Sequence, residues 1–230
     1  MAENIKLINI SNLDQGTIMI DFAALFLLIV ILIHTNMYRK RSLLQDKLFF
    51  SLAIIDVVIA VFDLGDYTLR TSYFPFSKMA VMISEMVFWI CFELFAFLFV
   101  LYLMCMSGKS INVKKNWVIY GIPAGVELIV IISNLFTGFL FYVDESNEYV
   151  EGFLFNFVYI GAFCYLIAAC FQIIKISKTY FFVLVVLLVA SMAWKFTGID
   201  LFSTAFNFAL VLAYSHINTM NDEFYKAVKE

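Results

Sequence analysis

Five acidic residues lie inside long apolar stretches of this chain and are the first candidates for chemistry: Asp56, Asp63, Glu85, Glu93 and Glu127. An unpaired charge in hydrocarbon is costly, so an acid in such a place commonly marks a ligand, ion or proton site. Asp56 and Asp63 share one helix face, whereas Glu85 and Glu93 are about 80° apart around their helix. No Lys or Arg lies at comparable depth.

These acids have two interpretations. Asp63, Glu85 and Glu127 are expected toward the outer half of their helices, where they could line an outward-facing cavity for a cationic or hydrogen-bond-donating ligand. Alternatively, each acid has a structural role and is paired with Ser, Tyr, Trp, a backbone group or interfacial water. The identity of a ligand stays open at this point.

Other kinds of site find little support in the residue pattern. His34 and His216 fall near the inner ends of two separate apolar runs, and no HxxxH or CxxC spacing accompanies them, so no metal site is expected. The four cysteines lie in apolar runs and are expected to pack as small hydrophobes. Phosphate-binding, GxSxG and HExxH motifs are missing, as is a basic stripe for nucleic acid. No catalytic residue or cofactor is therefore predicted.

The composition indicates an integral membrane protein. Of the 230 residues, 63% are hydrophobic and 14% are charged, and the mean hydropathy is +0.93. A soluble domain is nearer half apolar and a quarter charged. The expected partner is thus a lipid bilayer, and the expected location is the cell membrane, crossed several times.

Seven apolar stretches are long enough to cross a bilayer as helices. We therefore predict an all-α, polytopic bundle of seven transmembrane helices over residues 17–218, preceded by an outer segment, 1–16, and followed by a cytoplasmic tail, 219–230. The predicted spans are 17–36, 48–64, 79–106, 117–143, 153–174, 180–197 and 201–218. Pro123 lies early in the fourth and predicts a kink there.

The orientation follows from the distribution of basic residues. With the N-terminus outside and the C-terminus inside, 11 of the 15 Lys and Arg residues fall in inner segments. Cytoplasmic loops are the ones enriched in Lys and Arg. The loop between the fourth and fifth spans, with Asp144, Glu145, Glu148 and Glu151, is then an acidic tip outside the cell.

Around that tip the chain resembles the N-terminal seven-helix membrane region of bacterial diguanylate cyclases (GGDEF proteins), and more loosely the seven-helix input regions of histidine kinases. The family pattern NLFxGxLFxVDxxNxY is matched by Asn134, Leu135, Phe136, Gly138, Leu140, Phe141, Val143, Asp144, Asn147 and Tyr149. The resemblance implies a membrane sensor or input module of a bacterial signalling system.

The chain also departs from the family. Glu151 to Leu154 stand where the family has Arg-Gly-Pro-Leu, and no DxLTGLxNR or GGDEF sequence follows the last span. Diguanylate cyclase activity is therefore expected only if a catalytic half is encoded beyond Glu230 or on a partner, and a stand-alone sensor is the other expectation.

The tail has the pattern of a connector. An apolar stripe at three- and four-residue intervals predicts that the seventh helix continues into the cytoplasm, and it is formed by Ile217, Met220, Phe224 and Val228. Such a stripe would pair across a homodimer and transmit movement to a cytoplasmic signalling domain. The alternatives are an amphipathic tail on the inner leaflet and, for the whole chain, a small-solute permease or substrate-capturing membrane subunit that uses the intramembrane acids.

Overall fold

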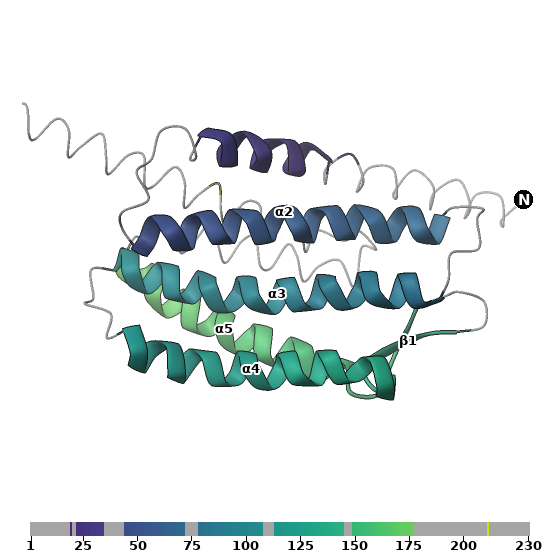
Figure 1. The fold of residues 1–230 in the computed structure, drawn as a ribbon. Helices are drawn as coiled ribbons and strands as arrows, with labels where there is room; N and C mark the ends of the chain where they lie inside the picture. Colours follow the sequence, from purple (N-terminus) through teal and green to yellow (C-terminus); the bar gives the residue numbers. More distant parts are fainter. Residues whose placement is uncertain are drawn as a thin grey trace, which may run out of the picture.

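The computed structural model describes residues 19, 22–34, 44–71, 78–107, 113–144, 149–176 and 211, and the remaining residues lie outside this description. The described part is mostly helical (Figure 1). Its long helices are α2 (Leu44–Thr71), α3 (Lys78–Met106), α4 (Val113–Thr137) and α5 (Phe155–Ile176), and a shorter apolar helix covers Phe22–His34.

Three of these helices contain segments long and apolar enough to cross a membrane: Leu44–Gly65, Lys78–Met106 and Trp117–Thr137. This confirms a helical protein with several candidate membrane spans. The seven-span count and the orientation stay predictions, because the sixth span and most of the seventh lie outside the described residues. Val211, within the predicted seventh span, is partly buried and packs against the larger hydrophobic cluster between the described helices.

Helix α3 is the centre of the bundle. It contacts α2, α4, α5 and the first strand of a small hairpin. In the apolar 18-residue stretch of each candidate span, 61% is buried for α3, against 39% for α2 and 22% for α4. A helix that is apolar all round is expected in such a position, because it has neighbours on every side. Figure 1 shows α2 on one side of α3 and α4 on the other, with α5 crossing behind.

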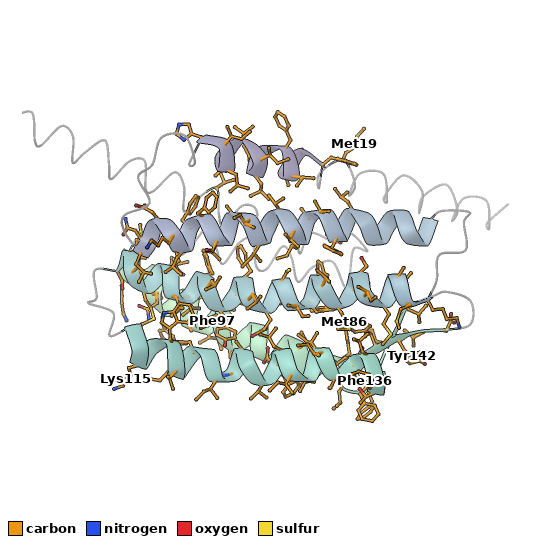
Figure 2. The ribbon with its side chains drawn as sticks, viewed as in Figure 1. Met19, Met86, Phe97, Lys115, Phe136 and Tyr142 are labelled. Atoms are coloured by element: carbon orange, nitrogen blue, oxygen red, sulfur yellow. The ribbon has the colours of Figure 1, made fainter. Side chains whose placement is uncertain are left out.

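Three of the basic residues that the sequence assigns to inner segments lie at the same end of the bundle. Lys47 at the start of α2, Lys115 near the start of α4 and Lys175 near the end of α5 belong to one end, and Figure 2 shows Lys115 there. The opposite end holds the strands that flank the acidic tip, with Tyr142 exposed at that end in the same view. The folded helices therefore bring the basic segments together at the predicted inner side.

The prediction for the tip was wrong in one respect. The fourth span was expected to continue to residue 143, but α4 ends at Thr137 and a β-hairpin follows. Strand β1 (Phe141–Val143) pairs antiparallel with β2 (Tyr149–Glu151), with Phe141 opposite Glu151 and Val143 opposite Tyr149. The candidate span of α2 ends at Gly65, one residue from the predicted end of the second span, but the helix itself continues to Thr71.

Two residues of the family-like pattern explain why α4 stops where it does. Gly138 has a φ of 62° and its N–H donates to the Asn134 carbonyl at 2.9 Å, which is the left-handed end typical of helices. The buried Asn134 side chain then accepts from the Leu140 N–H at 2.7 Å and donates to the Phe141 carbonyl at 2.8 Å. Asn134 therefore ties the last turn of α4 to β1.

The hairpin is also anchored to α3. A buried hydrophobic cluster joins Leu140 and Phe141 to Phe155 and to Trp89 of α3. The ring centroids of Trp89 and Phe155 lie 5.4 Å apart, with the ring planes nearly at a right angle. Figure 2 shows Met86, another member of this cluster, near the hairpin end of α3, and Phe136 on the outer side of α4. The residues around β1 are thus a packed part of the bundle.

Candidate functional site: a pair of buried carboxyl groups

The site begins with the buried face of α4. Four residues at three- and four-residue intervals are buried along this helix: Ala124, Glu127, Ile131 and Asn134. Residues so spaced form the seam that one helix presents to its neighbours. Glu127 is therefore held in the seam toward α3 and α5, and its exposure is only 6%.

Glu93 meets Glu127 from α3. Its side chain is fully buried and lies within hydrogen-bonding reach of the Glu127 carboxyl. Neither oxygen of Glu93, nor Oε2 of Glu127, receives a hydrogen bond from an N–H or O–H donor of the residues that the structure describes. Two carboxyl groups can bond to each other only if one of them carries a proton, because carboxylates are acceptors only. The pair is therefore set up to share a proton.

Helix α5 makes room for the pair at Gly161. A β-carbon at this position would overlap the Glu127 carboxyl group. The helix approaches closely because Gly161 has no side chain, as small residues commonly permit in membrane bundles. The carboxyl of Glu127 thus lies between Glu93 on one side and the bare backbone of α5 on the other.

One turn further along α5, Tyr165 completes the surroundings of the pair. It is buried, and it lies near enough to interact electrostatically with both carboxyl groups. Its hydroxyl donates to the backbone carbonyl of Tyr120, beside the turn of α4 where Pro123 removes a helical hydrogen bond. That donor is therefore already in use, and it does not replace a proton between the acids.

Asp56 is buried as completely as Glu93, with an exposure of 0%. It belongs to the face of α2 that also buries Leu52 and Ile59, and both of its carboxyl oxygens lack a hydrogen-bond partner among the described residues. No charged neighbour within that part of the chain interacts with it. The five predicted acids therefore divide into a pair, one isolated buried acid, and the half-buried Asp63 and Glu85, which have interactions of their own.

Glu127 lies midway along Trp117–Thr137 and faces Glu93, which lies midway along α3. Since α3 and α4 run antiparallel, their midpoints meet. Asp63 and Glu85 lie toward the hairpin end of their helices. That Asp63, Glu85 and Glu127 line an outward-facing cavity stays a prediction.

The other predicted residues are distributed as follows. Asp144 follows β1 and has interactions of its own, Tyr149 begins β2, and Asn147 lies outside the described residues. The tail residues and His216 also lie outside the description, whereas His34 is exposed at the end of its helix. Among the residues that the structure describes, no group of three or more His, Cys, Asp or Glu could hold a metal ion.

Sequence reasoning did not find Gly161 or Tyr165. A signal existed, because both lie on the buried face of α5, which repeats through Phe155, Val158, Gly161, Tyr165 and Ala169. A glycine on such a face indicates close approach of another group. What the sequence alone did not contain was the partner, an acid 34 residues earlier.

We predict that Gly161→Ala forces the Glu127 carboxyl away from Glu93. Overpacking of this kind costs about 1–3 kcal/mol, while alanine in a helix recovers about 1 kcal/mol, so a small net loss in the free energy of unfolding is expected. The diagnostic comparison is made in a Glu127→Ala background, where the overlap is gone and the same substitution should become neutral or stabilising. Gly121→Ala is the matched control, because its β-carbon would meet only ordinary contact with the Phe97 ring, 3.7 Å away.

We also predict that Asp56→Val stabilises the protein by about 1–3 kcal/mol, because replacing an unpartnered buried acid by an apolar side chain removes its desolvation cost. Unfolding in mixed micelles measures the change. Asp63→Val, seven residues further on and half-buried, is the control and should give no such gain. A loss of stability in Asp56→Val would show that the acid has a partner.

The fold and the site together define a helical membrane protein, with candidate spans joined around a buried acid pair. No family model, curated protein or solved structure matches this chain.

Proposed function

We propose that this chain is a membrane sensor, an input module of a bacterial signalling system that responds through its intramembrane acids. The observation that carries the proposal is the Glu93–Glu127 pair, which lies where α3, α4 and α5 meet and has no basic partner in the described part of the chain. The number of negative charges on the pair affects the packing of the three helices, because a second unneutralised charge in hydrocarbon is costly. A change at the pair is therefore a change in helix packing.

The proposed path runs from this junction to the cytoplasmic end. Helix α3 contacts α2, α4 and α5, so a shift of α4 against α3 reaches the whole bundle. The last predicted span and the striped tail, Ile217, Met220, Phe224 and Val228, would carry the shift to a signalling domain, on the same chain or a partner. Pairing of the stripe in a homodimer would make that shift readable.

The resemblance to the membrane regions of diguanylate cyclases supports this proposal through residues with a clear structural role. Asn134 and Gly138 of the shared pattern end α4 and fix β1. They hold the outer hairpin against Trp89 and Phe155 at one end of α3 and α5. A stimulus acting at the outer end would thus reach the helices that carry the acid pair.

The second candidate is a small-solute permease or substrate-capturing subunit. It is favoured by the depth of the acids, since Asp56, Glu93 and Glu127 all lie near the middle of their candidate spans, where transporters place substrate sites. Under this proposal the acids are a transit or capture site, and neutralising them abolishes uptake. Under the sensor proposal, neutralising them changes signalling, and neither the parent nor the variant transports a solute.

One experiment separates these functions. The full chain, with its four cysteines replaced by alanine and an environment-sensitive fluorophore on Lys226→Cys, is reconstituted in liposomes that enclose a pH-sensitive dye. A sensor predicts a shift of the tail fluorescence between the Glu93→Gln/Glu127→Gln variant and the parent, and an undissipated pH gradient in both. A permease predicts gradient dissipation or cationic solute uptake by the parent alone. An unchanged tail signal would contradict the sensor.

A further inference from the structure

We propose that the Glu93–Glu127 pair is a proton-binding site and that the proton it holds is the input of the sensor. The claim that this proton is the input rests on the proposed function. The proton-binding site itself rests on the geometry of the pair. In the protonated pair, one carboxyl group donates to the other. On release the proton passes to water, and two carboxylates remain face to face.

Within the described helices, the pair has no other source of neutralisation. Glu93 is fully buried, and among the described residues its one charged neighbour is Glu127. From α5, Tyr165 faces both acids with its own hydroxyl proton committed to Tyr120, and Cys164 beside it is exposed. Three buried oxygens of the pair lack a donor from the described helices, and a proton between the carboxyl groups satisfies the bond that they are placed to make.

A proton fits this site better than a metal ion or an organic cation does. A metal ion in a protein takes four to eight ligands, according to its type, mostly oxygen, nitrogen or sulfur atoms, and the described residues supply no third acid, His or Cys at this point. An organic cation needs a cavity, yet the Gly161 backbone closes on the Glu127 carboxyl so tightly that a β-carbon would overlap it. A proton needs neither further ligands nor space.

Loss of the proton must alter the packing of the helices. Two facing carboxylates repel, and the low dielectric of the bundle strengthens that repulsion. Glu93 is fixed in the middle of the most buried helix, whereas α4 is the most exposed of the three candidate spans. Deprotonation is therefore expected to move α4 with Glu127 away from α3, or to admit water between them. Asp56 on α2 has no facing carboxyl group among the described residues and should cause no such movement.

Infrared spectroscopy of the full chain in liposomes tests the site. Protonated carboxyl groups have a carbonyl stretch that is distinct from that of carboxylates and shifts in heavy water. We expect the parent to lose part of this band as the pH is raised, and Glu93→Gln/Glu127→Gln to lack that titrating part while keeping the helical circular dichroism of the parent. Asp56→Asn should retain the titrating part. A band in the parent that is constant over the whole pH range, or one that titrates equally in the double variant, would overturn the proposal.

Two further arms decide between ligands and between proposals. The titration is repeated with sodium replaced by choline at equal ionic strength, and loss of the band on adding sodium at fixed pH would overturn the proton in favour of a metal cation. The fluorophore on Lys226→Cys is followed in the same samples. A titrating band with a constant tail signal leaves the proton site standing and refutes the sensor. A tail that responds to bilayer thickness while the band stays constant refutes the proton site and leaves the sensor.

Discussion

Asn134→Ala is expected to lower the free energy of unfolding by about 3 kcal/mol, because it leaves buried backbone groups without their partners. The Leu140 N–H loses its acceptor at 2.7 Å, and the Phe141 carbonyl loses the donor at 2.8 Å. Both residues are almost fully buried in the cluster that joins the hairpin to α3, so water does not replace the lost bonds. Equilibrium unfolding in mixed micelles measures the loss.

Two neighbouring variants make that result specific. Asn134→Asp keeps the acceptor for Leu140 but removes the donor to Phe141. Its free energy of unfolding should lie between those of the parent and Asn134→Ala, or below both if the new acid stays charged. Ser133→Ala removes only a bond to the carbonyl one turn earlier and should change stability by less than about 0.5 kcal/mol. If Asn134→Ala were as stable as Ser133→Ala, the role assigned to Asn134 would be wrong.

Gly152→Ala is expected to cost about 2–3 kcal/mol. A β-carbon at Gly152 would overlap the backbone carbonyl of Phe139. That carbonyl accepts from the Leu154 N–H at 3.0 Å, and the Gly152 N–H donates to the Leu140 carbonyl at 2.6 Å. Neither strand can therefore shift to make room without breaking a hydrogen bond, in contrast to Gly161, where the obstacle is a movable side chain.

The control for Gly152→Ala is Gly125→Ala, because a β-carbon at Gly125 would meet nothing within 4 Å. It should be neutral or stabilising by up to about 1 kcal/mol, since alanine favours the helix. Equal losses at both glycines would mean that the two substitutions act through something other than the close approach at the hairpin.

The sequence predicts a helix end well where polar residues follow the apolar run, and poorly where the apolar run continues past the end of the helix. The third span was predicted within one residue of α3 because Lys78 and the polar residues after Met106 bound one uninterrupted apolar run. The fourth was extended too far, because Phe139 to Val143 are as apolar as the helix before them, and a short apolar run does not distinguish strand from helix. Gly138 contained the missing information, as the residue that ends α4 in the left-handed conformation.

The candidate site was predicted as a list of acids and not as an arrangement. Hydropathy identified Glu93 and Glu127 as charges inside apolar helices, but their pairing depends on how α4 is rotated and how far it slides along α3. Packing decides both, through the seam of Ala124, Ile131 and Asn134. The close approach of Gly161 from α5 then fixes the carboxyl group in place.

The most direct test of the central claim, that Glu93 and Glu127 form one unit, is a double-mutant cycle on the unfolding free energy in mixed micelles. Truncating either acid to alanine leaves the other without its partner, so the double variant should cost less than the sum of the singles, with a coupling of about 0.5–3 kcal/mol. The parallel cycle of Asp56→Ala with Glu127→Ala should be additive within about 0.5 kcal/mol. Additivity of Glu93→Ala with Glu127→Ala would contradict the paired site.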